Sequence, residues 1–379
     1  MIFKISSSKK PATLKSFAAL LVLCLGACDS SKSSPASPQT TLTSVQTTGP
    51  FWSGTRSNVY TRNDGEDVTV QLWYPTSDET GDAVRYDNLL DGDSWVDAIP
   101  DCTASRPVVV FSHGNGGVRW QSAFNMHFLA THGFVVIAME HPQNTFRDLD
   151  RGLFPEHTLQ RPKDVKDTFD WLIQQGRTES NELFGCINPE DGYAVMGHSF
   201  GGYTSFMASG ATVELTQIEA ACDEGTDAAC RIASLWQAES DATTISLHDP
   251  RIWAAITWSP WDAGGVLGDG MDSIGVPTLT LTGTLDELTP LDQVSRLVNA
   301  ASGADYVQFI DAGHFSFAPF SCMLLDGDGC GEDFMDIERV KTLTNQIVTS
   351  FLAKQLGWQS ASKQYLDIEA ADIAWQPER

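Results

Sequence analysis

Apolar and polar residues along the chain follow the pattern of strands that alternate with helices. Residues 107–112 and 134–139 are continuous apolar runs, typical of parallel strands that are buried on both faces. Residues 68–74 alternate between apolar and polar side chains and predict a strand that Pro75 ends. Shorter apolar segments predict four further strands, at 193–196, 253–258, 277–282 and 306–310.

Helices are predicted between these strands. Residues 121–132 form a helical segment that Gly133 ends, and residues 164–175 carry apolar side chains on one helical face. Residues 340–356 predict a last helix, and the chain has no internal repeat. This order predicts one α/β domain with a mostly parallel, twisted sheet and helices on both faces.

Composition and charge narrow the class of protein. The chain has 379 residues, of which 42% are hydrophobic and 19% charged, which excludes a disordered chain, a collagen or a coiled coil. Its 24 Lys and Arg against 49 Asp and Glu give a net charge of −25, which repels phosphate backbones and anionic lipid headgroups. Nucleic acid is therefore not an expected partner.

The N-terminus has the pattern of an export signal. Four lysines precede an apolar run at 16–27 that is too short to cross a bilayer as a permanent helix. Residues 25–28 read Leu-Gly-Ala-Cys and resemble the lipobox of bacterial lipoproteins, which implies cleavage before Cys28 and lipidation of its sulfur. A Sec signal followed by a chance cysteine is the alternative.

The expected organisation has three parts. Residues 1–27 are a lipoprotein signal peptide, 28–50 a lipidated cysteine with a flexible tether rich in Ser, Thr and Pro, and 51–379 the folded domain. Cleavage removes four lysines and no acidic residue, so the mature charge is 20 − 49 = −29. We expect an exported cell-envelope lipoprotein, on the periplasmic or outer-surface side, held at a membrane by its N-terminal lipid.

Cysteine usage agrees with export. Beyond Cys24 and Cys28, an even set of six cysteines remains, which predicts disulfides although sequence alone allows fifteen pairings. Proximity favours Cys222 with Cys230 and Cys322 with Cys330, leaving Cys102 with Cys186. In the chain-entropy model the long loop stabilises by about 4.6 kcal/mol and each short loop by about 2.6. No Cys/His cluster argues for a metal.

A candidate nucleophile follows the strand at 193–196. Residues 197–201 read Gly-His-Ser-Phe-Gly, a G-x-S-x-G placed between a buried strand and a helix, as in a nucleophile elbow. The tight turn lifts the Ser199 hydroxyl above the sheet and directs a helix N-terminus at it. A plain glycine-rich turn would give the same five residues, so the surrounding pattern matters.

A serine nucleophile needs a base and an orienting acid, in the chain order Ser, acid, His for this fold class. Only His248 and His314 lie downstream of Ser199. Asp286 follows the strand at 277–282, and with Asp286 as the acid only His314, just after the strand at 306–310, can be the base.

Alternatives to this assignment stay open. Glu287 and Asp292 are further candidates for the acid, and His314 could be a surface histidine in a glycine loop. His198 is expected to pack beside the elbow rather than act as the base, since adjacent side chains diverge there.

Two backbone N–H groups are candidates for an oxyanion hole. One belongs to Phe200, the residue after the nucleophile. The other is assigned to Asn115, in the loop at 113–117 that reads His-Gly-Asn-Gly-Gly. A phosphate-binding P-loop is the alternative for this glycine run, but no Lys-Ser/Thr follows it.

Three segments resemble the plasma-type platelet-activating-factor acetylhydrolase family, which shares its α/β-hydrolase fold with dienelactone hydrolases. They are residues 111–115, 130–141 and 197–202, within a likeness that runs with gaps from about residue 68 to 358. The resemblance implies the α/β-hydrolase fold. It also implies the catalytic triad Ser199, Asp286 and His314, with Asn115 and Phe200 as the oxyanion donors.

A second likeness concerns the substrate pocket. Residues 259–262, Ser-Pro-Trp-Asp, are similar to the segment that lines a subsite in bacterial cutinases and polyester hydrolases. Those enzymes usually carry Met after the nucleophile, where this chain has Phe200, which argues against polyesterase activity. Trp261, Trp258 and Trp120 are candidates for an aromatic acyl pocket, although each could equally be a core residue.

Two further segments have patterns that suggest a cap and a calcium loop. Residues 211–250 lie where hydrolases commonly insert a lid, so a small helical cap is expected there, with a solvated helix pair as the alternative. The acidic segment 326–336 has a hint of calcium-ligand spacing. It has Ile337 where the bidentate Glu of a calcium loop belongs, so no metal is assigned.

The sequence therefore predicts a serine carboxylic ester hydrolase that works through an acyl-enzyme on short-chain or soluble small-molecule esters, without a cofactor. The alternatives are a phospholipid acetylhydrolase of the platelet-activating-factor type, a polyester hydrolase, and a non-catalytic binding lipoprotein. Acyl and alcohol specificity and the oligomeric state stay open.

Overall fold

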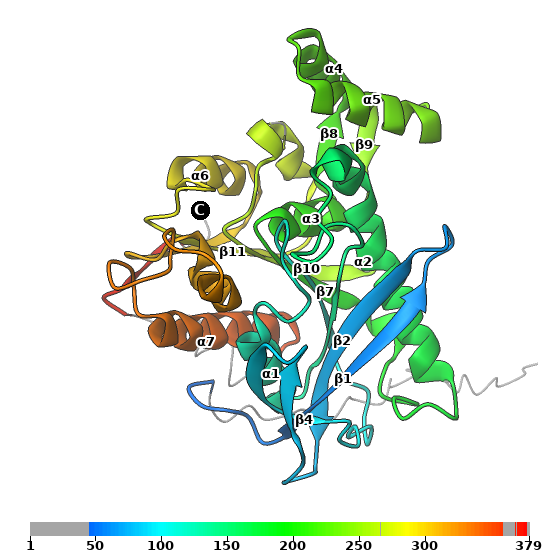
Figure 1. The fold of residues 1–379 in the computed structure, drawn as a ribbon, viewed down its shortest axis with the longest axis vertical. Helices are drawn as coiled ribbons and strands as arrows, with labels where there is room; N and C mark the ends of the chain where they lie inside the picture. The colour runs from blue at the N-terminus through cyan, green and yellow to red at the C-terminus, as the bar shows by residue number, and fades with distance from the viewer. Residues whose placement is uncertain (1–44, 266, 359–367, 369, 377–379) are drawn as a thin grey trace, which may run out of the picture. The chain divides into compact units, whose positions relative to one another are not determined.

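An eleven-stranded sheet organises the residues that the computed structural model describes, which are 45–265, 267–358, 368 and 370–376 (Figure 1). The strands lie in the order β13-β12-β11-β10-β7-β5-β6-β2-β1-β4-β3. Their bounds are β1 Trp52–Thr61, β2 Asp67–Thr76, β3 Ala83–Tyr86, β4 Leu90–Val96, β5 Val108–Ser112, β6 Val135–Met139, β7 Tyr193–His198, β10 Ile252–Trp258, β11 Thr278–Gly283, β12 Asp305–Phe309 and β13 Ile373–Gln376.

The centre of the sheet is parallel. Every neighbouring pair from β6 to β12 runs in the same direction, and Val110 of β5 lies between Ile137 of β6 and Val195 of β7. Antiparallel pairs lie towards the edges, where β2 joins β6 and β1, β3 joins β4, and β13 joins β12. The prediction of a mixed α/β domain with a mostly parallel sheet is confirmed.

Helices connect the strands and cover the sheet. The α-helices are α1 Ala123–Thr131, α2 Phe154–Arg177, α3 Phe200–Ser209, α4 Leu215–Asp223, α5 Asp227–Glu239, α6 Leu291–Ala300 and α7 Ile337–Gln355. Short 3₁₀ turns are η1 Arg151–Leu153, η2 Pro189–Asp191, η3 Ala263–Gly265, η4 Asp269–Ser273, η5 His314–Phe317 and η6 Pro319–Met323.

Both faces of the sheet are buried, because successive side chains of a strand point to opposite faces. In β5, Val109 and Phe111 belong to a core that also holds the apolar residues of α1 and α7. Val108 and Val110 face the other way, into a core completed by α2. This double burial accounts for the continuous apolar runs that the sequence shows in β5 and β6.

Helix α2 begins ten residues before the predicted helix at 164–175 and continues through Pro162. Proline has no N–H, so it cannot donate to the carbonyl oxygen of Thr158, four residues earlier. The hydroxyl of Tyr203 in α3 donates to that oxygen instead, at 3.1 Å. A contact from another helix therefore satisfies the group that proline leaves open, and the sequence around Pro162 gives no sign of it.

Three disulfides join the six cysteines in the pairing that the sequence favours: Cys102 with Cys186, Cys222 with Cys230, and Cys322 with Cys330. Cys102 precedes β5 and Cys186 precedes β7, so this bridge lies at the amino ends of two neighbouring parallel strands. It braces the edge of the sheet opposite to the strands' carboxyl ends.

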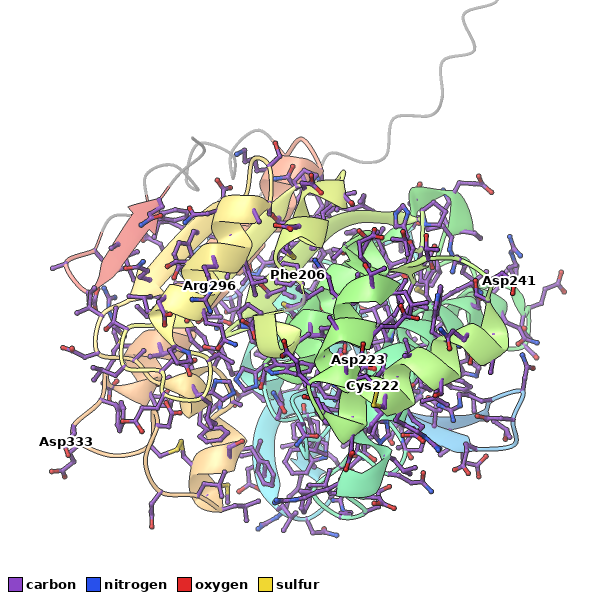
Figure 2. All side chains as sticks on the ribbon, turned by 90° about the horizontal axis from the view of Figure 1, so that it is seen from above. Phe206, Cys222, Asp223, Asp241, Arg296 and Asp333 are labelled. Carbon is purple, nitrogen blue, oxygen red and sulfur yellow. A yellow bond between two sulfur atoms is a disulfide. The ribbon has the colours of Figure 1, made fainter. Side chains whose placement is uncertain are left out.

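Residues 211–250 form a small insertion. The short strands β8 Thr212–Glu214 and β9 Thr244–Ser246 pair with each other and enclose α4 and α5, which lie at the top of Figure 1. Ion pairs of Arg231 with Glu156 and of Lys163 with Glu239 fix α5 to α2. In Figure 2, Cys222 of this insertion lies apart from Asp333 of the acidic segment.

The predicted signal peptide at 1–27 and the lipidated Cys28 lie outside the described residues, as does most of the tether at 28–50. These assignments stay predictions. Within the described part of the chain, no helix is both long enough and apolar enough to cross a membrane.

Candidate active site

The residues selected from the sequence gather at one edge of the sheet. Ser199 follows β7, Asp286 follows β11, His314 follows β12, and the loop at 113–117 follows β5. These four strands are parallel, so their carboxyl ends meet at the same edge. Segments that are far apart along the chain are thereby brought together.

Ser199 occupies a strained turn between β7 and α3. Its backbone angles, φ 57° and ψ −118°, are rare for a residue with a side chain and cost roughly 1–3 kcal/mol. A Cβ at Gly197 would collide with the carbonyl oxygen of Gly201, and a Cβ at Gly201 would collide with that of Ser112. Both glycines are needed for steric reasons, and the turn leaves Ser199 partly exposed among buried neighbours.

His314 and Asp286 form a buried pair. Nδ1 of His314 lies 3.0 and 3.1 Å from the two carboxylate oxygens of Asp286. Thr289 donates its backbone N–H and its hydroxyl to the same carboxylate, at 2.7 and 2.8 Å. Burial acts to raise the pKa of Asp286, but the hydrogen bonds and the charge of His314 outweigh it, so the pKa lies below its ordinary value. Asp286 therefore stays a carboxylate at neutral pH.

Ser199 and His314 line one cavity of about 420 Å³, together with Asn115, Phe200 and Trp261. The peptide N–H of Trp261 donates to the carbonyl oxygen of Ser199 at 3.0 Å, which ties the segment at 259–262 to the elbow. The structure thus brings together the serine, the histidine–carboxylate pair and both expected oxyanion residues around one space.

His198 has both ring nitrogens engaged. Its Nε2–H donates to the carbonyl oxygen of His314 at 3.0 Å, and its Nδ1 accepts from the side-chain amide of Gln121 at 3.1 Å. Burial, together with the nearby His314, lowers the pKa of His198 to about 3. It is a neutral side chain that holds the backbone of His314.

The loop at 113–117 presents the backbone N–H of Asn115 at the cavity. Three of its N–H groups have acceptors: that of Gly114 donates to Gln121 Oε1, that of Gly116 to the Asn144 carbonyl, and that of Gly117 to the Gly114 carbonyl. The N–H of Asn115 has no acceptor among the described residues, and Asn115 is exposed at the cavity.

The second donor comes from the start of α3. Phe200 is the first residue of this helix, so its N–H has no intrahelical acceptor, and the positive end of the helix dipole lies beside Ser199. A Cβ built on Gly114 would be 3.4 Å from the Cβ of Ser199, which shows how closely the loop approaches the elbow.

Two of the three tryptophans expected to bind substrate lie elsewhere, and this expectation is corrected. Trp258 is fully buried, because as the last residue of β10 it points with Ile256 towards the α1 and α7 face. Trp120 is also fully buried, and its Nε1–H donates to Asp87 at 2.7 Å. Only Trp261, in the loop after β10, lines the cavity.

The walls of the cavity are aromatic and aliphatic, and they come from two segments that the sequence did not single out. Residues 146–154 contribute Phe146 and Phe154, and residues 315–325 contribute Phe315, Phe320 and two leucines. The insertion at 211–250 contributes none of the described lining residues. The expected cap over the site is therefore replaced by these two segments.

The acidic segment at 326–336 binds to the site's backbone. The carboxylate of Asp328 accepts the N–H groups of His314 at 2.8 Å, Leu288 at 3.1 Å and Glu287 at 3.2 Å. It thereby joins the loop of the histidine to the loop of the acid. Among the described residues, no group of three His, Cys, Asp or Glu side chains could hold a metal ion.

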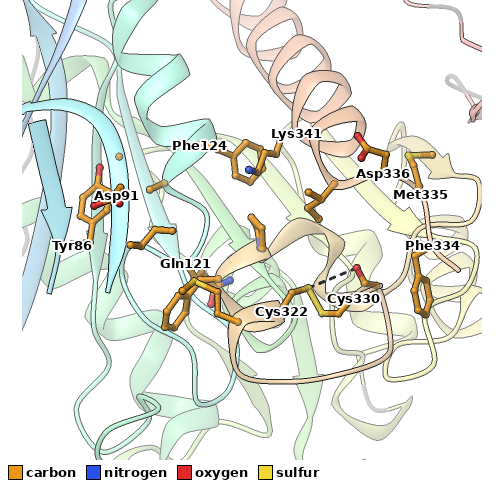
Figure 3. Close-up of a pocket in the computed structure, with 18 of the residues that line it drawn as sticks. Tyr86, Asp91, Gln121, Phe124, Cys322, Cys330, Phe334, Met335, Asp336 and Lys341 are labelled. Carbon is orange, nitrogen blue, oxygen red and sulfur yellow. Dashed lines mark hydrogen bonds between the residues drawn. A yellow bond between two sulfur atoms is a disulfide. The ribbon is translucent and has the colours of Figure 1, made fainter. Parts of the chain in front are cut away.

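A larger cavity of about 700 Å³ adjoins the first (Figure 3). Gln121 and Phe320 line both cavities and form the wall between them. The labelled residues around this second space include Phe124, Phe334 and the Cys322–Cys330 disulfide.

Comparison with known families identifies the segment that carries the loop at 113–117. The family model described as platelet-activating factor acetylhydrolase, isoform II, matches residues 92–147, which include β5, α1 and β6. No curated protein sequence matches the chain. The family match agrees with the resemblance noted in the sequence and supports a hydrolase of the lipase and esterase type in general.

Proposed function

We propose that this protein is a serine carboxylic ester hydrolase with an α/β-hydrolase fold. The observation that carries the proposal is the buried His314–Asp286 hydrogen bond at 3.0 Å, with Ser199 and His314 lining one cavity. A carboxylate that holds Nδ1–H of a histidine leaves Nε2 free to accept the proton of a serine hydroxyl. The strained turn at Ser199 and the family match support the same function.

In the proposed reaction, Ser199 Oγ attacks the ester carbonyl carbon while His314 Nε2 takes the hydroxyl proton. The N–H groups of Asn115 and Phe200 stabilise the oxyanion that forms, and each such donor contributes roughly 3–4 kcal/mol to the transition state. His314 then protonates the leaving alcohol, and an acyl group remains on Ser199. A water molecule, deprotonated by His314, releases the carboxylic acid and restores the serine.

The proposed substrate is a small carboxylic ester with a short acyl chain. A cavity of about 420 Å³ with aromatic walls suits such a molecule. A phospholipid with a short acyl chain is the second candidate, and the family match favours it. The net charge of −25 opposes binding to an anionic lipid surface.

Labelling and turnover test this function together. We expect a fluorophosphonate probe to modify the folded wild-type protein at Ser199, and a Ser199→Ala variant to be neither labelled nor active. A series of p-nitrophenyl esters then gives the acyl preference, with acetyl and butyryl esters expected to react fastest. A folded wild-type protein that stays unlabelled, or a Ser199→Ala variant that keeps full esterase activity, would contradict the proposal.

A further inference from the structure

Arg161 of α2 is a charged side chain with an unusual position. It is fully buried, and no carboxylate in the described part of the chain lies within ion-pair distance of its guanidinium. Burial lowers its pKa to about 9. A buried charge without an ionic partner costs folding free energy, so its contacts need an explanation beyond stability.

The guanidinium holds the start of the loop at 113–117 through three hydrogen bonds. Its Nη1 donates to Asn144 Oδ1 at 2.5 Å, and its Nη2 donates to the carbonyl oxygen of His113 and to Ser112 Oγ. Ser112 and His113 lead directly into the Gly114–Asn115 peptide. The start of the loop is therefore fixed by the arginine itself.

Asn144 links Arg161 to residues further along the loop. Its Nδ2 donates to the side-chain oxygen of Asn115 at 2.9 Å, and its carbonyl oxygen accepts the N–H of Gly116 at 3.1 Å. Asn144 is itself buried, in the loop that follows β6. Arg161 thus orients Asn144, and Asn144 holds both the residue with the free N–H and its neighbour.

The second oxyanion residue contacts the same arginine. The guanidinium carbon of Arg161 lies 4.4 Å from the centre of the Phe200 ring, in a cation–π contact. The Arg161 side chain therefore contacts both the loop that carries the Asn115 N–H and the ring of Phe200, although Asn115 and Phe200 are 85 positions apart in the sequence.

We propose that Arg161 is a positioning residue of the oxyanion hole: through Asn144 and the His113 carbonyl it fixes the Asn115 N–H, and through the ring of Phe200 it fixes the second donor. This inference rests on the proposed function. The loop contains three glycines, whose backbone freedom is large, so a rigid donor requires such an anchor. A displacement of about 1 Å in an active site can cost 10²-fold in rate.

Two variants test the proposal by different routes. Arg161→Met removes the charge, whereas Asn144→Asp keeps an acceptor for Arg161, replaces the donor to Asn115 with a second acceptor and adds a negative charge beside the guanidinium. Using the best p-nitrophenyl ester, we expect kcat to fall roughly 10²-fold in each, with KM changed by less than about threefold. Affinity for a trifluoromethyl ketone, which forms a tetrahedral adduct, should fall by the same factor as kcat/KM. Arg161→Lys, which keeps a single point charge, should restore part of the rate.

The matched control is Arg106→Met. Arg106 is another buried arginine, but it pairs with Asp101 at 2.9 Å near the amino end of β5. We expect this variant to lose stability and to keep its kcat and its inhibitor affinity. If Arg161→Met does not fold, Asn144→Asp decides alone, because its contact with the guanidinium is kept.

The outcomes separate this inference from the proposed function. A labelled, active wild-type protein whose Asn144→Asp variant keeps both kcat and ketone affinity would overturn the role of Arg161 and leave the esterase intact. Equal losses of kcat in Arg161→Met and Arg106→Met, without loss of ketone affinity, would also overturn it, as that is the result of a structural role. A wild-type protein that is neither labelled nor active would refute both.

Discussion

At the scale of single residues, one aspartate joins the two halves of the proposed acid–base pair. His314 and Asp286 come from different loops, and Asp328 accepts backbone N–H groups from both loops, at 2.8 Å from His314 and 3.1 Å from Leu288. Hydrogen bonds to an ionised acceptor are worth about 1.5–3 kcal/mol each. The distance between imidazole and carboxylate therefore depends on a second acidic residue, Asp328, which has no part in the proposed proton transfer.

Removal of this acceptor should lower the rate. In an Asp328→Ala variant we expect kcat for a p-nitrophenyl ester to fall about tenfold or more, since the backbone of His314 loses a charged acceptor of about 1.5–3 kcal/mol. Asp326→Ala, in the same loop and exposed, is the matched control and should keep its rate. Equal rates in the two variants would show that Asp328 has no influence on the pair.

At the scale of elements, the sequence predicts the parallel centre of the sheet well. The strands at 107–112, 134–139 and 277–282 agree with β5, β6 and β11 to within a residue at each end. Their apolar runs are long because both faces are covered, and this requirement can be read in the sequence itself. Ser199, Asp286 and His314 could be selected for the same reason, since each directly follows such a strand.

Other features depend on contacts that no local pattern records. Trp258 points to the α1 and α7 face because of its place in β10. The Thr158 carbonyl that Pro162 leaves open in α2 accepts a hydroxyl from Tyr203 of another helix. Arg161 and Asn144 belong to no motif, and their role arises only where two distant segments meet. The position of Asn144 after β6, at the same edge as the serine, is the signal that could have drawn attention to it.

The wall between the two cavities is formed by Phe320 of η6 with Gln121, and the ring of Phe320 packs edge-on against Trp120 at 4.3 Å. We expect Phe320→Ala to join the cavities, so that longer acyl chains gain apolar contacts. Because each buried CH₂ contributes about 0.8 kcal/mol, the ratio of kcat/KM for octanoyl over acetyl p-nitrophenyl esters should rise at least about tenfold.

The control for this change is Phe315→Ala, which enlarges only the cavity that holds Ser199. If both variants alter the octanoyl to acetyl ratio equally, the second cavity does not receive the acyl chain. Thermal unfolding should accompany the kinetics, since truncating a buried phenylalanine costs roughly 3–5 kcal/mol.

At the scale of the whole molecule, the carboxyl edge of the sheet contains three buried neutral histidines, His113, His141 and His198. Burial lowers the pKa of each, in His198 to about 3. Two carboxyl groups act in the opposite sense: burial raises the pKa of Asp164, which is bonded to His141 at 2.7 Å, and the pKa of Glu140, which directly follows β6. The three histidines outnumber these two carboxyl groups, so protonation should on balance favour the unfolded chain.

The sign of the resulting pH dependence follows from proton counting. Between the ordinary histidine pKa near 6.5 and the lowered pKa in the folded protein, the unfolded chain binds more protons than the folded protein does. The stabilisation from the neutral histidines is therefore complete above about pH 6.5, and the free energy of unfolding decreases as the pH falls. Each histidine contributes a slope of up to about 1.4 kcal/mol per pH unit. Urea unfolding of wild type and His198→Gln between pH 7.5 and pH 4 measures this dependence. The free energy of unfolding of the variant should change less steeply with pH. Identical slopes would mean that His198 is already protonated in the folded protein.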